Sequence, residues 1–179
     1  MRKLSMEELG RATPEAFRGQ AKTPIVVVVD NLRSALNVGS IFRTADAFAL
    51  EKIYLCGITA RPPHREILKT ALGSTETVEW EYVENAAELV QNLRQHGFAT
   101  WAVEQAAGST SLERFDWQPQ QKIAVVFGNE VEGVGEQVIE TCDGCLEIPQ
   151  FGTKHSLNVA VCVGIITWEL IKKIKFPLP

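Results

Sequence analysis

The sequence predicts an α/β fold with a mostly parallel sheet flanked by helices. Short segments rich in valine, isoleucine and aromatic residues alternate with segments of helical pattern along most of the 179 residues. Several of the short segments are continuous apolar runs, which are typical of strands covered on both faces. Such alternation indicates parallel strands that are joined by helical crossovers.

The expected strands are residues 25–29, 52–55, 78–82, 99–103, 123–127 and 146–148. The expected helices are residues 39–49, 85–96, 135–142 and 157–173, with a short helix after the Pro62-Pro63 loop that ends near Leu72. Asn85 has the side chain of an N-cap, and Gly97 is a stop signal. Residues 1–22 are polar and basic, so we expect an N-terminal extension or short helix, followed by one domain at 23–179.

Composition is that of an ordinary globular protein. Hydrophobic residues make up 45% of the chain and charged residues 22%, which argues against disorder. No apolar run reaches the ~18 residues of a membrane helix, and the basic start of the chain lacks the apolar core of a signal peptide. We therefore expect a cytoplasmic protein with no membrane partner.

The four cysteines fit this compartment. Cys56 and Cys162 lie in apolar runs and have the setting of small core residues. Cys142 and Cys145 have the spacing of a metal knuckle, but no second Cys or His pair completes the four ligands of a structural zinc. A thioredoxin-like motif would follow a strand rather than precede one. The sequence therefore predicts no metal.

The net charge of −4 hides an uneven distribution. Residues 1–70 carry 11 Lys/Arg against 7 Asp/Glu, residues 71–150 carry 3 against 14, and residues 151–179 carry 4 against 1. Basic charge thus gathers at both ends of the chain. If the fold brings these ends together, a local positive face can exist on an acidic protein; otherwise the charges only solvate the surface.

Three stretches with glycines overlap the loops that follow predicted strands: residues 37–45 (NVGSIFRTA), 125–134 (VVFGNEVEGV) and 148–161 (IPQFGTKHSLNVAV). Ligands of open α/β sheets bind beyond the carboxyl ends of strands. In the third stretch, Ser156 and Asn158 can cap an apolar helix, which also fits a core helix without a ligand. Rossmann and Walker loops are absent, so nucleotide sites of those types are excluded.

In this order, the three stretches resemble the signature motifs of the SpoU/TrmH-type RNA ribose methyltransferases of the SPOUT superfamily. The resemblance extends from about Thr23 to Leu170. It implies a C-terminal deep trefoil knot, an exception to the rule that chains are unknotted. It also implies a homodimer in which both subunits border each active site, and the apolar faces of the helix at 39–49 and of the last helix suit such an interface.

The resemblance further implies that S-adenosylmethionine binds in the knot, held by loops at 102–105, 127–129 and 148–157. The expected cofactor residues are Val103, Glu104, Phe127, Gly128, Asn129, Ile148, Gln150, Ser156 and Leu157. Gly128 allows close approach of backbone to ligand, and Ile148 and Leu157 can enclose an adenine. Gln150 stands where methionine is frequent in the family, which leaves the detailed contacts of its loop open.

The catalytic residues that the resemblance implies are Asn37, Arg43, Glu130, Ser156 and Asn158. An arginine in a helix as apolar as that of Arg43 usually meets a specific anion; a solvated surface arginine is the alternative. In the family this arginine is described as the base for the ribose 2′-hydroxyl. Arginine resists deprotonation, so we prefer a role in holding phosphate and orienting the hydroxyl. Glu130 and Asn37 are expected near Arg43, where the carboxylate can fix its orientation.

These observations predict an S-adenosylmethionine-dependent methyltransferase acting on a ribose 2′-hydroxyl of tRNA or rRNA. The alternatives are a non-catalytic RNA-binding or assembly factor on the same fold, and an α/β enzyme of small molecules. Transfer RNA is slightly favoured, because a surface without an added RNA-binding domain suits a compact, shape-recognised RNA. The candidate phosphate contacts are Arg2, Lys3, Arg11, Arg18, Arg33, Arg61, Arg65, Lys69, Lys172, Lys173 and Lys175.

Overall fold

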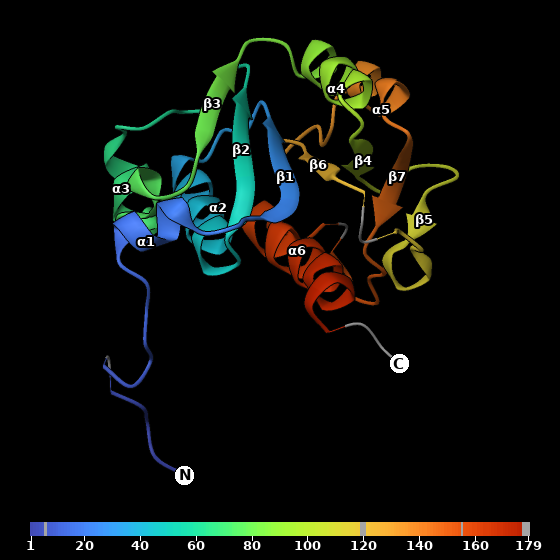
Figure 1. Ribbon diagram of the computed structural model, residues 1–179. Coiled ribbons are helices and arrows are strands. Elements are labelled where there is room, and N and C mark those ends of the chain that lie inside the picture. Colours follow the sequence, from blue (N-terminus) through green and yellow to red (C-terminus); the bar gives the residue numbers. More distant parts are fainter. Residues whose placement is uncertain (6, 119–120, 155, 177–179) are drawn as a thin grey trace.

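Seven parallel strands form one sheet in the computed structural model (Figure 1), which describes residues 1–5, 7–118, 121–154 and 156–176. All the strand pairs are parallel, which confirms the predicted fold class. The strand order is β3-β2-β1-β6-β4-β7-β5. The strands are β1 (Thr23–Asp30), β2 (Leu50–Cys56), β3 (Trp80–Val83), β4 (Ala99–Val103), β5 (Thr110–Ser111), β6 (Ile123–Phe127) and β7 (Gly144–Glu147).

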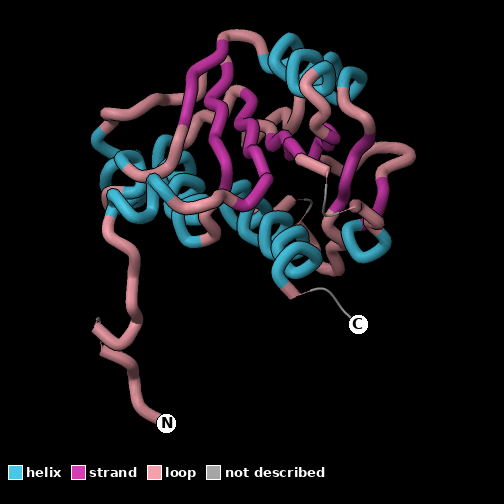
Figure 2. The backbone as a smooth tube through the Cα atoms, viewed as in Figure 1, coloured by secondary structure: helices cyan, strands magenta, loops and turns pink. Residues whose placement is uncertain are grey.

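Helices cover both faces of this sheet. They are α1 (Pro14–Gly19), α2 (Ala35–Ala47), α3 (Arg65–Ala71), α4 (Ala86–Gln95), α5 (Glu136–Thr141) and α6 (Val159–Lys175), with 3-10 turns η1 (Ser74–Glu76) and η2 (Leu112–Arg114). Helices α2, α3 and α6 pack on one face and α4 and α5 on the other (Figures 1 and 2). Alternate valines of β1 face the two layers, which explains its continuous apolar run. None of the described helices is long and apolar enough to span a bilayer.

Some strand boundaries differ from the expected ones. The strands at 99–103 and 123–127 have the predicted bounds. Strand β7 begins two residues early, at Gly144, where a Cβ would lie 2.3 Å from the Trp101 ring. A glycine between the expected helix and the expected strand is therefore needed inside the strand. Strand β3 begins at Trp80 because the Val78 amide still closes the η1 turn. The two residues of β5 are too few to show a periodic pattern.

Helix α2 begins four residues before the expected start at residue 39. Ser34 caps it, since its hydroxyl accepts a hydrogen bond of 3.3 Å from the Asn37 amide. Gly39 lies inside the helix, against α3. A Cβ on Gly39 would lie 2.1 Å from Thr70 Oγ1 and 2.3 Å from the Ile67 carbonyl oxygen. Glycine is unfavourable in the interior of a helix. The sequence pattern therefore suggested a helix start at Gly39, where the structure has close packing between two helices.

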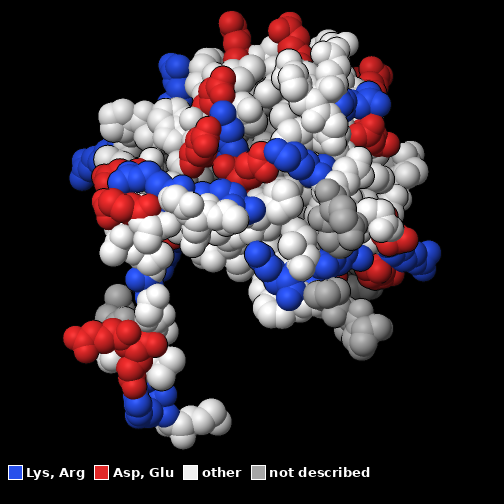
Figure 3. Space-filling model, in the orientation of Figure 1, with Lys and Arg blue, Asp and Glu red and all other residues white. Residues whose placement is uncertain are grey.

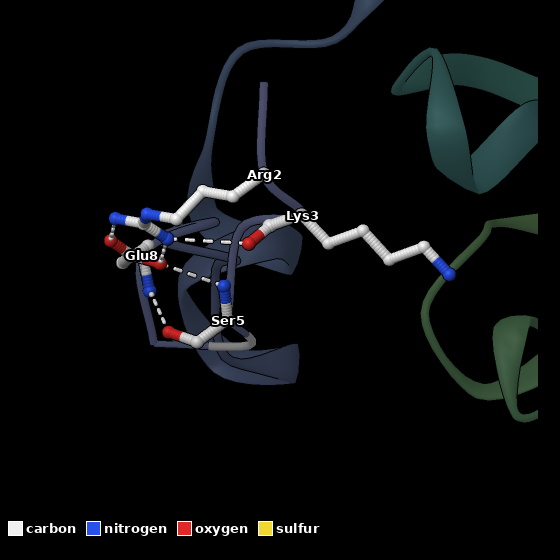
Figure 4. Close-up of polar contacts among 4 residues, drawn as sticks. All are labelled: Arg2, Lys3, Ser5 and Glu8. Atoms are coloured by element: carbon white, nitrogen blue, oxygen red, sulfur yellow. Dashed lines mark hydrogen bonds and ion pairs between the residues drawn. The ribbon is translucent and has the colours of Figure 1, made fainter.

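The N-terminal segment consists of α1 and an arm that extends away from the body (Figure 1). In the arm, Arg2 pairs with Glu8 at 2.6 Å, and Glu8 also accepts the Ser5 amide (Figure 4). The hydrogen bond from Arg2 lowers the pKa of Glu8 to about 2, but an ion pair in solvent adds little stability. That residues 1–22 lie outside the domain stays a prediction.

The trefoil knot also stays a prediction. The strand order fits a non-sequential C-terminal half, because β6 lies between β1 and β4, and β7 lies between β4 and β5. Helix α6 then returns to pack on α2.

The packing of Gly39 yields a prediction about stability. Gly39→Ala should lower the free energy of unfolding by about 1–3 kcal/mol, because the new methyl group forces α2 and α3 apart. The matched control is Gly19→Ala at the end of α1, where a Cβ meets nothing within 4 Å. Urea unfolding measures both. Equal stabilities of the two variants would contradict the packing account.

Candidate active site

A cavity of about 560 Å³ lies beyond the carboxyl ends of β4, β6 and β7. The nine residues expected to bind the cofactor all line it, together with Glu130 and Asn158. Asn37 and Arg43 do not line it. The lining residues that the sequence did not single out are Gln105, Val131, Glu132, Gly133, Leu146, Glu147, Val159 and Cys162. Gln105 belongs to the expected loop at 102–105, and each of the others is close in sequence to a predicted residue, so a wider window around the loops would have included them.

The loop after β6 is a tight turn closed by its own backbone. Asn129 and Gly133 exchange two backbone hydrogen bonds, of 3.0 and 3.1 Å. The Asn129 side-chain oxygen accepts the amides of Val131 and Glu132, each at 2.8 Å. A Cβ on Gly128 would lie 1.9 Å from the Gly133 carbonyl carbon. Gly128 is therefore required by the turn itself, a reason that differs from the expected approach of a ligand.

Glu104 ties the end of β4 to this turn. Its Oε2 accepts the Val134 amide at 3.1 Å, and its Oε1 accepts the Gln105 amide at 2.9 Å. Gly133, with a φ of +70°, passes so close that a Cβ there would lie 2.0 Å from Glu104 Oε2. The carboxylate thus joins two walls of the cavity.

The third wall leads into α6. Asn158 is the N-cap, and its side-chain oxygen accepts the amides of Ala160 at 2.9 Å and Val161 at 3.4 Å. Ser156, which the sequence also suggested for the start of the helix, is exposed and lines the cavity without capping α6. His155 of this motif lies outside the described residues.

A hydrogen-bond network on the rim joins three of the predicted catalytic residues. Asn37 Nδ2 donates to Glu130 Oε1 at 2.9 Å, and Asn158 Nδ2 donates to Asn37 Oδ1 at 3.1 Å. Glu130 also accepts the backbone amides of Arg33 and Ser34, each at 3.2 Å. The carboxylate thus connects the turn after β6 to the loop that starts α2, and Asn37 connects both to α6.

These contacts set the ionisation of Glu130. Partial burial tends to raise its pKa, but hydrogen bonds from its own backbone, Asn37, Arg33 and Ser34 together outweigh burial and lower the pKa. Glu130 is therefore a carboxylate at neutral pH and a weak proton acceptor. The arrangement suits a group that orients its neighbours.

Arg43 lies elsewhere. It is on the exposed side of α2, outside the cavity. Six helical residues separate it from Asn37, which amounts to about 9 Å along the axis and a different face. The expectation that Glu130 orients Arg43 is not met within one chain, because the carboxylate is already held by the loop and Asn37.

The charge distribution is mixed where it can be seen. On the face that Figure 3 shows, Lys/Arg and Asp/Glu side chains are interspersed, and neither sign forms one continuous patch. The positive face suggested by the charged ends of the chain does not lie on this side.

The cysteines lack the features of a reactive or metal-binding set. Burial, with Asp143 nearby, raises the pKa of the Cys142 thiol to about 12, and burial raises the pKa of Cys145. Thiols of raised pKa are rarely ionised at neutral pH and are therefore poor nucleophiles. Among the described residues, no group of three or more His, Cys, Asp or Glu side chains is arranged to hold a metal ion.

The fold and the cavity define an α/β protein with a ligand site beyond the carboxyl ends of a parallel sheet. Residues 24–168 match the model of the SpoU rRNA Methylase family, so the chain belongs to this family. Over 154 residues it is 30% identical to the 23S rRNA (guanosine-2′-O-)-methyltransferase RlmB of Vibrio parahaemolyticus. That alignment covers 86% of this chain and 61% of the relative, so the chain spans about three fifths of its length.

Solved structures agree with this assignment. An AdoMet-bound rRNA methyltransferase from Sinorhizobium meliloti is 26% identical, with a TM-score of 0.78 over 90% of this chain and 60% of that one. A TrmH/SpoU tRNA modifying enzyme from A. aeolicus is 27% identical, with a TM-score of 0.77 over 89% of this chain and 79% of that one.

The lowered pKa of Glu130 predicts a pH dependence of stability. Above the unfolded-state glutamate pKa of about 4.3, the wild type should be more stable than Glu130→Gln. The difference should disappear as the pH falls through the lower folded-state pKa. It should stay below about 1 kcal/mol because the side chain is largely exposed. Urea unfolding from pH 3 to 7 measures it, with Glu132→Gln as the control. A difference that grows toward low pH would show that the sign is wrong.

Proposed function

We propose that this protein transfers a methyl group from S-adenosylmethionine to a ribose 2′-oxygen of structured RNA. The observation that carries the proposal is the network of Asn37, Glu130 and Asn158 on the rim of a cavity bounded by three loops that follow strands. Such a cavity, with polar side chains fixed at its mouth, suits a bound cofactor that reacts with a second substrate at the rim.

The residues of the cavity suit S-adenosylmethionine. Val103, Phe127, Ile148 and Leu157 offer apolar walls for an adenine, while the turn after β6 and the loop after β7 offer polar backbone groups. When bound, the cofactor supplies an electrophilic methyl group on a sulfonium. Glu104 stabilises the walls by holding the amides of Gln105 and Val134. The AdoMet-bound relative supports this assignment.

The rim residues would position the ribose. Direct methyl transfer needs the 2′-oxygen in line with the methyl group and the hydroxyl proton removed, so correct placement supplies much of the rate. Ser156 and Asn158 face the cavity, where they can contact both cofactor and ribose. Glu130 and Asn37 hold Asn158 in place.

Arg43 would reach the ribose that is bound at the site of a second subunit. An exposed apolar stripe on α6 comprises Val161, Ile165 and Trp168, which are 50%, 36% and 46% exposed. Their spacing puts them on one side of the helix, and α2, which carries Arg43, packs beside α6. A homodimer would bury this stripe and bring α2 of each chain toward the cavity of its partner. There Arg43 would hold a phosphate and orient the hydroxyl.

Arg43→Ala should abolish methyl transfer and leave cofactor affinity nearly unchanged. Gly128→Ala should lose cofactor binding, because its Cβ disrupts the turn.

If Arg43 acts on the cavity of the partner, mixing the two inactive variants should restore activity, since each mixed dimer holds one intact site. Radiolabelled methyl transfer measures the mixture, and circular dichroism checks the folding of each variant. A mixture as inactive as its components would place Arg43 in its own chain's site.

Cofactor binding and the identity of the product distinguish a methyltransferase from a non-catalytic RNA-binding factor. Purified protein should bind S-adenosylmethionine in calorimetry, and nucleoside analysis should find the methyl group on the sugar. RNA binding without cofactor binding would favour the non-catalytic factor, and methylated base with unmodified ribose would contradict the chemistry.

Transfer RNA is the substrate that we favour. The similarity to the TrmH/SpoU tRNA modifying enzyme from A. aeolicus supports this choice. Ribose methylation should therefore disappear from a tRNA in a strain that lacks the gene, which sequencing-based mapping of 2′-O-methylation measures. Loss of a ribosomal mark instead would overturn the substrate but leave the chemistry intact.

A further inference from the structure

A second cavity, of about 750 Å³, lies between the loop that follows β2 and strand β3, which is the edge strand on the other side of β1. The loop between β2 and α3 forms one side of it, and Trp80 and Tyr82 of β3 form the other. Because all the strands are parallel, this cavity and the one at β4, β6 and β7 open at the same edge of the sheet. Strand β2 is two positions from β6, which corresponds to about 10 Å.

The walls of the second cavity are planar and cationic. The guanidinium carbon of Arg61 lies 4.2 Å from the centroid of the Tyr82 ring. Arg61 is exposed and Tyr82 half-buried. The Trp80 ring packs on Phe42 of α2, and Tyr82, two residues along the strand, points to the same side of the sheet. An arginine stacked on an aromatic ring makes a flat surface on which another planar group can lie.

Cations continue from this cavity along α3. Arg65 and Lys69 are exposed and four residues apart, so they share one side of the helix. Within the part of the chain that the structure describes, Arg61, Arg65 and Lys69 form no ion pair with an acidic side chain. Cations without an acidic partner in the protein are available to an external anion.

The loop of the second cavity is fixed to the loop that carries the catalytic network. The hydroxyl of buried Thr59 accepts the Leu32 amide at 2.9 Å, and the Asn31 side chain accepts the Ile58 amide at 3.1 Å. The next two residues, Arg33 and Ser34, donate to Glu130. A ligand in the second cavity would therefore be held at a constant distance from the ribose site.

We propose that the second cavity binds an unpaired nucleobase of the RNA substrate, stacked on Arg61 and Tyr82, while Arg65 and Lys69 contact the adjoining phosphates. This inference rests on the proposed function, since it names the part of the RNA that lies beside the methylated ribose. Every base has a π-face that stacks on arginine or an aromatic ring, and the neighbouring backbone is anionic. A flat cationic wall next to free cations matches both.

Binding of a short unstructured oligouridine, followed by fluorescence anisotropy, tests the stacking. Tyr82→Leu and Arg61→Lys should each weaken binding about tenfold, because each removes one planar partner while Arg61→Lys keeps the charge. Tyr82→Phe should bind as the wild type does. Lys122→Ala is the control, because Lys122 lies over the Phe98 ring at the opposite edge of the sheet, before β6.

The outcomes separate this inference from the proposed function. All the variants should keep the affinity for S-adenosylmethionine, and a 5-bromouridine oligonucleotide should crosslink to Tyr82 or Trp80. Three outcomes would each overturn the cavity assignment. They are wild-type affinity of the Arg61→Lys variant for the oligonucleotide, crosslinks that form only at other residues, and a wild-type protein that binds no RNA. A wild type that shows the expected binding pattern and crosslinks but transfers no methyl group would instead overturn the proposed function. Thermal melting checks that Tyr82→Leu is folded.

Discussion

The carboxylate of Glu130 is the group on which the geometry of the candidate site depends. It stands in the turn after β6 and accepts hydrogen bonds from the end of the β1–α2 loop and from Asn37, which in turn accepts one from Asn158. Three segments that are distant in sequence thus meet around one charge. Since Asn158 also caps α6, the position of the last helix depends on the same contacts. The lowered pKa of Glu130 keeps this charge present to a lower pH than that of an ordinary glutamate.

The cavity behind this network is built from tight backbone contacts. Gly128 and Gly133 allow the turn after β6 to fold against itself and against Glu104. A Cβ at either glycine would collide with these neighbours. Glu104 then fixes the turn to β4. The two walls held in this way need no further ordering when a ligand binds, which lowers the entropic cost of binding.

Much of the fold and of the cavity could be predicted from the sequence, because both follow from local patterns. The apolar runs at 99–103 and 123–127 are strands with those bounds, and the cavity residues follow such runs. Features that depend on tertiary contacts could not be predicted. Gly144 and Gly39 resemble breakers, but each fills a site too close to a neighbouring element for a side chain. The separation of Arg43 from Asn37 follows from the start of α2 at Ala35, four residues before the expected start, which places both residues in one helix on different faces.

The most direct test of the central claim is a double-mutant cycle between Glu130 and Asn158, which do not bond directly but share Asn37. Glu130→Gln, Asn158→Ala and the double variant would be compared by the kcat/KM of methyl transfer. A network that acts as one unit predicts a coupling energy of about 0.5–3 kcal/mol, so the double variant should be less impaired than the two single effects combined. Strictly additive effects would contradict the claim that Glu130 holds Asn158 in place through Asn37.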